Sequence, residues 1–136
     1  MAGNAPEITM RWRERQLFEA GPPGRPALLV DGDSAVAVSP VELLLVAAAT
    51  CSAADVVSIL EKQRVRLRSL EVGLRGTRRD EHPRRYTALH FVFSLSGDGA
   101  DDVKARRAID LSLEKYCSVV ASLAPDIRVT YDVALR

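Results

Sequence analysis

The sequence predicts a single-domain α+β fold, and three observations lead to this class. Segments with an apolar side chain at every second position, as in β-strands, lie near both ends and in the middle of the chain. Two long segments between them have the capping residues and composition of helices. The length of 136 residues fits one domain, residues 1–136, with a substantial core. The expected order is βββ-α-ββ-α-β, with strands and helices segregated.

The N-terminal region is expected to form a three-stranded meander. Ile8, Met10 and Trp12 alternate with polar residues, which is typical of a half-buried strand. A second strand is expected at 16–19 and a third at 27–30, with a Gly-Pro-Pro-Gly turn between them.

The first helix has a clear start. Ser39 is a good N-cap, Pro40 suits the first helical position, and Glu42 completes a capping box. From Val41 to Leu60 the helix is apolar, small or hydroxylic on all sides, so it must be covered on every side. A second long helix and a partner subunit are the natural candidates to cover it.

The second half predicts a long hairpin, a helix and a final strand. Segments 64–79 and 84–96 alternate in hydrophobicity, with a one-residue slip at Arg68-Ser69 that is either a bulge or the true start of the strand. Asp101 and Asp102 open a second helix that is expected to run to about Leu123. The hairpin's apolar face contains Leu89, Phe91, Phe93 and Leu95, and the final strand covers 127–135.

Composition restricts the class of function. With 47% hydrophobic residues and a net charge of +1, the chain is neither disordered nor an electrostatically driven nucleic-acid or membrane binder. The N-terminus lacks the charged start and apolar run of a signal peptide. The apolar stretch from Leu43 to Leu60 contains Asp55, so we interpret it as a buried helix rather than a membrane span. We therefore expect a cytoplasmic protein.

The two cysteines are the only chemically distinctive residues. Cys51 lies midway along the first predicted helix and Cys117 towards the end of the second. They are either inert core thiols or a redox pair. Small residues around Cys51 allow another element to come close, and helices crossing there could bring the Cα atoms to the roughly 5.5–6 Å of a disulfide.

Four segments resemble the OsmC/Ohr family, namely Ser39–Leu43, Cys51-Ser52, Asp55–Leu60 and Glu114–Val119. The last two are most similar to its YhfA-like branch, and the resemblance covers essentially the whole chain. It implies the OsmC-like fold, an intertwined homodimer with two long central helices and active sites at the subunit interface. Such an interface would cover the apolar first helix.

The resemblance also implies a cysteine-based thiol peroxidase that reduces organic hydroperoxides in oxidative stress defence. Cys51 matches the peroxidatic cysteine, which becomes a sulfenic acid, and Cys117 matches the resolving cysteine. A dithiol, typically on a lipoyl-bearing protein, would reduce the resulting disulfide. No metal, other cofactor, nucleic acid or membrane is implied as a partner.

This sequence departs from the family peroxidases at two places. The position of their glutamate holds Val41, and Glu42 falls on the opposite side of the helix, where we assign it to the capping box. Their Gly-Gly-Arg loop is absent, and Arg13, Arg15 and Arg25 are nearby alternatives, none of which matches by position. A second interpretation therefore stays open, a dimeric protein that binds a small ligand in the inter-subunit cleft without turnover.

The histidines are weaker candidates. His82 precedes a proline in a predicted turn and is expected to be exposed. His90 alternates with Leu89 and Phe91 and should lie on the opposite face of its strand. The cysteines and histidines lack the paired spacing of a zinc site, so we expect no metal.

Overall fold

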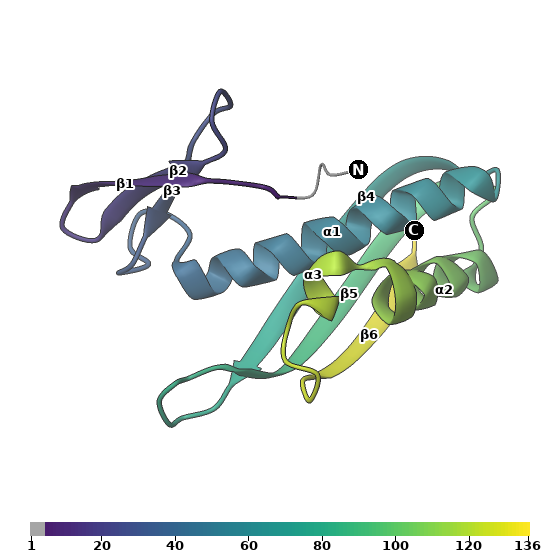
Figure 1. Cartoon of the computed structure of the whole chain (residues 1–136). Helices are drawn as coiled ribbons and strands as arrows, with labels where there is room; N and C mark the ends of the chain where they lie inside the picture. Colours follow the sequence, from purple (N-terminus) through teal and green to yellow (C-terminus); the bar gives the residue numbers. More distant parts are fainter. Residues whose placement is uncertain (1–4) are drawn as a thin grey trace. The chain divides into compact units, whose positions relative to one another are not determined.

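The observed element order is three strands, a helix, two strands, an interrupted helical segment and a last strand (Figure 1). This computed structural model describes residues 5–136. The chain divides into two compact units, the first ending at Leu44 and the second beginning at Leu45. The α+β class and the predicted order are confirmed, with a correction to the second helix that is given below.

The first unit contains an antiparallel three-stranded sheet in the order β1-β2-β3. Its strands are β1 (Thr9–Glu14), β2 (Leu17–Gly21) and β3 (Leu28–Asp31). The predicted meander is therefore present, but β1 is not half-buried, because Met10 is 55% exposed and Trp12 is 62% exposed. Alternation gives a strand one apolar face, and its neighbours in the same sheet do not cover that face.

A buried aspartate closes this meander. The Asp31 carboxylate accepts hydrogen bonds from the backbone N–H groups of Val36 (2.9 Å), Asp33 (2.8 Å) and Ala35 (2.9 Å). These bonds lower the pKa of Asp31, because they favour its ionised form. The loop between β3 and the first helix is thus fixed by one side chain.

Helix α1 (Pro40–Lys62) begins with the predicted capping box. The Ser39 N–H donates to Glu42 Oε1 (2.9 Å), and the Glu42 N–H donates to Ser39 Oγ (3.2 Å). The Ser34 hydroxyl also donates to Glu42 Oε1 (3.0 Å). The Ser39 backbone bond is the main cause that lowers the pKa of Glu42. Our structural assignment of Glu42 is confirmed.

The apolar surface of α1 is only partly covered within the chain. The fully buried positions recur every fourth residue and are Ala48, Ser52, Val56 and Leu60. Val46 and Val57 remain 47% and 41% exposed. Coverage on every side, as expected from the sequence, is therefore not supplied by this chain alone. By length and composition α1 could also cross a membrane, a property that core helices of soluble proteins share.

The second unit contains a three-stranded sheet in the order β4-β5-β6. Strands β4 (Arg66–Arg78) and β5 (Tyr86–Asp98) form the predicted antiparallel hairpin, and β6 (Arg128–Leu135) pairs with β5 in parallel. The register of β4 shifts between Leu67 and Ser69, so the slip in the sequence is a β-bulge.

The core lies on one face of this sheet. The predicted apolar face of β5, namely Leu89, Phe91, Phe93 and Leu95, is almost completely buried. The rings of Phe91 and Phe93 stack with centroids 5.7 Å apart. Helix α2 (Asp102–Leu111) contacts β6, and the Tyr131 hydroxyl of β6 donates to Asp110 of α2 (2.8 Å) (Figure 1).

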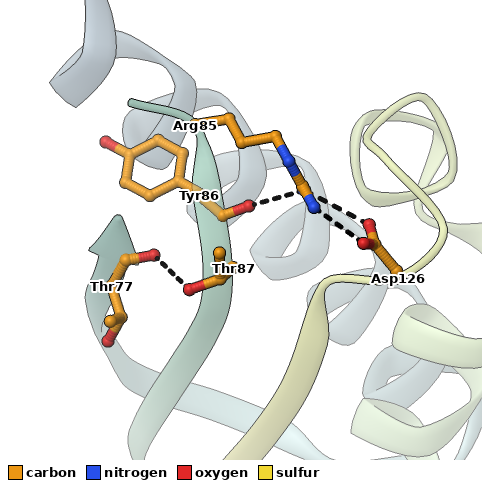
Figure 2. A network of polar contacts seen from close by, with 5 residues as sticks. All are labelled: Thr77, Arg85, Tyr86, Thr87 and Asp126. Carbon is orange, nitrogen blue, oxygen red and sulfur yellow. Dashed lines mark hydrogen bonds and ion pairs between the residues drawn. The ribbon is translucent and has the colours of Figure 1, made fainter. Parts of the chain in front are cut away.

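A bidentate ion pair joins the start of β5 to the loop before β6 (Figure 2). Arg85 Nη2 donates to Asp126 Oδ2 (2.7 Å) and Arg85 Nη1 to Asp126 Oδ1 (3.2 Å), while Nη1 also donates to the Tyr86 carbonyl (3.1 Å). The Arg85 guanidinium lowers the pKa of Asp126. This contact fixes where the chain enters the parallel strand.

The second helix is not the continuous helix to Leu123 that we expected. Asp101 caps α2 by accepting from the Lys104 N–H (2.8 Å), as predicted, but α2 ends at Leu111. A π-helical turn, η1 (Ser112–Tyr116), follows, then Cys117 in an extended conformation and the short helix α3 (Ser118–Ala121). The interruption arises because the Cys117 N–H bonds to the Ser112 carbonyl (2.7 Å), five residues back rather than four.

Candidate functional site

The structure brings Cys51 and Cys117 together. Cys51 projects from the middle of α1 and is partly exposed, whereas Cys117 follows η1 and is only 3% exposed. Both are free thiols, and Cys51 lies close enough to Cys117 to be one of the groups that raise the pKa of the Cys117 thiol. Two sulfurs that are far apart in the sequence therefore meet between α1 and the interrupted second helix.

Burial decides the protonation of Cys117. Loss of solvent raises the pKa of the Cys117 thiol, because burial penalises the charged thiolate. The nearby backbone N–H groups of Val120 and Val119 lower the pKa of Cys117 by less than burial raises it. Cys51 raises the pKa of Cys117 further. The Cys117 side chain forms no capping hydrogen bond to α3. Cys117 is therefore a protonated thiol at neutral pH.

The π-turn sets the direction in which Cys117 points. In a continuous α-helix the Tyr116 N–H would bond to the Ser112 carbonyl, and each residue would advance by about 100°. In the π-turn one more residue is inserted, and the Ser112 carbonyl accepts from the Cys117 N–H instead of from the Tyr116 N–H. The orientation of Cys117 towards α1 follows from this extra residue.

A buried polar network lies beside the thiols. Ser52 and Ser112 are fully buried, and their Oγ atoms are 3.1 Å apart. Ser112 Oγ is also 2.9 Å from Asp55 Oδ2. The Ser112 hydroxyl is the donor to both Asp55 Oδ2 and Ser52 Oγ, so its single proton is shared between two acceptors.

A groove of about 540 Å³ runs along α1 beside the second helical segment. Asp55, one turn after Cys51, and Tyr116, the residue before Cys117, line it, and neither cysteine does. Ile59 and Leu111 give it an apolar floor, and its other lining residues are Ser58, Lys62, Gln63 and Arg107. The groove offers a small organic molecule apolar surface about one helical turn from Cys51.

The arginines that were considered for activation lie in the first unit. Arg13 forms an ion pair with Glu19 across β1 and β2 (3.1 Å). The Arg15 carbonyl accepts from the Trp12 indole (2.8 Å) at the β1–β2 turn, and Arg25 lies exposed in the loop before β3. Arg13 thus has the solvated strand position that the sequence suggested.

The histidines belong to other surroundings. His82 is exposed in the β4–β5 turn. His90 bonds through Nδ1 to Thr130 Oγ1 (2.7 Å) and through Nε2 to Asp132 Oδ2 (3.1 Å). Within residues 5–136 no group of three or more His, Cys, Asp and Glu side chains is arranged to hold a metal.

Sequence reasoning missed Ser112 and the π-turn. The signal was present on α1, where Ser52 and Asp55 interrupt an otherwise apolar segment, since a buried polar group requires a hydrogen-bond partner. No pattern identified that partner, because Ser112 lies 57 residues after Asp55 in the sequence.

Known proteins resemble this chain over most of its length. The family model described as OsmC-like protein matches residues 31–132. Protein YhfA of Escherichia coli strain K12 is 41% identical over 126 residues, which is 92% of this chain and 94% of YhfA. Both findings confirm the resemblance that was noted in the sequence.

Solved structures share the fold. A hypothetical protein from Aquifex aeolicus VF5 superimposes with a TM-score of 0.85 at 27% identity, over 98% of each chain. An organic hydroperoxide resistance protein OsmC from Legionella pneumophila has a TM-score of 0.69 at 13% identity, covering 98% of this chain and 99% of its own. At that identity the second likeness shows the fold alone.

Proposed function

Because this chain belongs to the OsmC-like protein family, we propose that it is a cysteine-based thiol peroxidase that reduces organic hydroperoxides. The observation that carries the proposal is that Cys51 and Cys117, 66 residues apart in the sequence, lie close enough for Cys51 to raise the pKa of the Cys117 thiol. Two neighbouring thiols are what a peroxidatic and a resolving cysteine require. The groove that starts one helical turn after Cys51 has apolar surface for the organic part of a substrate.

The first step is attack by the Cys51 thiolate on the hydroperoxide. Its sulfur bonds to the outer oxygen, the O–O bond breaks, and the alcohol leaves after taking up a proton. Cys51 is oxidised to a sulfenic acid by two electrons, which reduce the O–O bond. Cys51 is partly exposed and is therefore the thiol that a substrate reaches.

The second step forms the disulfide. The Cys117 sulfur attacks the Cys51 sulfenic sulfur, an S–S bond forms, and hydroxide leaves as water with the Cys117 proton. A dithiol such as a lipoyl-bearing protein then returns both cysteines to thiols and becomes a disulfide itself.

The proposal includes a cytoplasmic homodimer. Exposed apolar side chains on α1, such as Val46 and Val57, supply a surface that a second copy would cover. The proposed dimer also accounts for the uncovered face of β1, which bears Met10 and Trp12.

Thiol titration with tert-butyl hydroperoxide tests the function. Wild type should lose both thiols, regain them with dithiothreitol, and show a native mass of two 14.9 kDa chains. Cys51→Ser should lose no thiol, because Cys117 is buried and protonated. An unchanged thiol titre in wild type contradicts the peroxidase. A co-purifying small ligand in native mass spectra would then favour the non-enzymatic binding protein.

A further inference from the structure

Ser112 is the residue at which the second helix changes its hydrogen-bonding pattern. Its N–H still bonds back into α2, to the carbonyls of Ala108 and Ile109. Its carbonyl instead accepts from Cys117 (2.7 Å), which closes the π-turn. The backbone of one residue therefore joins the regular helix to the resolving thiol.

The side chain of Ser112 connects the same residue to α1. Its hydroxyl is fully buried and donates to Asp55 (2.9 Å), with Ser52 as the other partner (3.1 Å). A serine side chain is short, so η1 is held close to α1 at this point. A buried hydroxyl that lost these partners would be strongly unfavourable, and the bond is therefore retained.

The same turn of α1 holds both contacts. Cys51, Ser52 and Asp55 lie within one helical turn, and their partners Cys117 and Ser112 lie at the two ends of η1. The thiol contact and the hydroxyl–carboxylate contact thus run side by side between the same two segments. Whatever fixes η1 against α1 also sets the separation of the sulfurs.

We propose that Asp55 and Ser112 are positioning residues that hold the π-turn against α1 and keep Cys117 within bonding reach of Cys51. Asp55 accepts the hydrogen bond of the Ser112 side chain and so restrains Ser112. The backbone carbonyl of Ser112 in turn accepts from the Cys117 N–H and so restrains Cys117. The role of Asp55 and Ser112 in turnover rests on the proposed function, but the readiness of the two thiols to form a disulfide is a property of the pair that can be measured without any hydroperoxide.

Equilibration with oxidised and reduced glutathione measures that property. One glutathione disulfide takes two electrons and two protons from Cys51 and Cys117, giving one intramolecular S–S bond and two glutathione thiols. The oxidised fraction at several glutathione ratios, after acid quenching and alkylation of free thiols, gives the equilibrium constant. Mixed disulfides are separated by mass.

Ser112→Ala and Asp55→Leu should each lower this constant about tenfold, because the hydrogen bond between residues 55 and 112 no longer restrains the pair. The double variant should lose little more than either single one, since both remove the same bond. Asp55→Asn keeps a carbonyl acceptor and should stay near wild type. Ser118→Ala is the matched control, an exposed serine next to Cys117 outside the network.

The outcomes separate the two proposals. Constants within twofold of wild type for Ser112→Ala and Asp55→Leu overturn the positioning role, whatever their melting temperatures. Asp55 is only partly buried, so Asp55→Leu decides the matter if the buried Ser112→Ala does not fold. A wild type that forms the disulfide with glutathione but consumes no hydroperoxide contradicts the peroxidase and leaves the positioning role intact. A wild type that forms no intramolecular disulfide overturns both.

Discussion

The two cysteines are presented by segments of opposite character. Cys51 lies in the middle of α1, a regular helix of 23 residues that begins with a capping box. Cys117 follows a helix of 10 residues and a π-turn of 5, and it precedes a helical turn of only 4. The regular segment leaves its thiol partly exposed, and the interrupted one buries its thiol.

Under the proposed function, this difference suits the two thiols to different tasks. A regular helix holds its side chains at fixed positions, which suits the sulfur that meets a substrate. The π-turn ends at Cys117 and presents it near Cys51, which suits the sulfur that completes the disulfide after the first oxidation. Burial keeps Cys117 from reacting with the substrate first.

The largest expected effect comes from Cys117→Ser. Without its partner, oxidised Cys51 cannot form the intramolecular disulfide, so tert-butyl hydroperoxide should leave a sulfenic acid and, in excess, a sulfinic acid. Intact mass should show one and then two added oxygen atoms, where wild type loses two hydrogens. If Cys51 in the Cys117→Ser protein returned to the thiol without added reductant, Cys117 would not be needed to resolve oxidised Cys51, and the comparison of the two segments would fail.

A smaller effect is expected in alkylation by iodoacetamide. At pH 8, Cys117 in Cys51→Ser should react at least about tenfold more slowly than Cys51 in Cys117→Ser, because it is buried and the thiolate is the nucleophile. Burial raises the pKa of Cys117 above its ordinary value of 9.0, so its rate should still be rising beyond that pH. Equal rates of the two single-cysteine variants would contradict the comparison.

The smallest effect concerns the start of α1. Ser39→Ala should lower the free energy of unfolding by about 1 kcal/mol at pH 7 and leave the glutathione equilibrium unchanged. The pKa of Glu42 is lowered in the folded protein, so the capping contribution is present above the ordinary value of 4.5 and is lost as the pH falls through the folded pKa. Urea unfolding at pH 7 and in acid measures this. If the loss of unfolding free energy caused by Ser39→Ala were larger in acid than at pH 7, this prediction would be contradicted.

Local patterns were sufficient for most of the fold. Alternation predicted the strands, the Ser39–Glu42 box predicted the start of α1, and the slip at Arg68-Ser69 marked a bulge. The interruption of the second helix was not predictable, because no local pattern marks the residue at which the Cys117 N–H bonds five rather than four residues back, to Ser112. The parallel pairing of β6 with β5 likewise depends on long-range contacts, which no local pattern encodes.

The candidate site was predictable in its chemistry but not in its construction. The positions of Cys51 and Cys117 in matching motifs pointed to a thiol pair, and in the structure Cys51 lies close enough to raise the pKa of the Cys117 thiol. The network that supports them was visible only in part, as Ser52 and Asp55 within an apolar helix. Burial of Ser112 and the shifted pKa of Cys117 depend on packing, which the sequence does not specify residue by residue.

The exposure of Trp12 has a practical consequence for spectroscopy. It is the single tryptophan of the chain, and its indole lies on β1 in the first unit, 62% exposed. Intrinsic fluorescence therefore reports on whatever covers β1. A blue shift of the emission with rising protein concentration would register self-association directly, without any label.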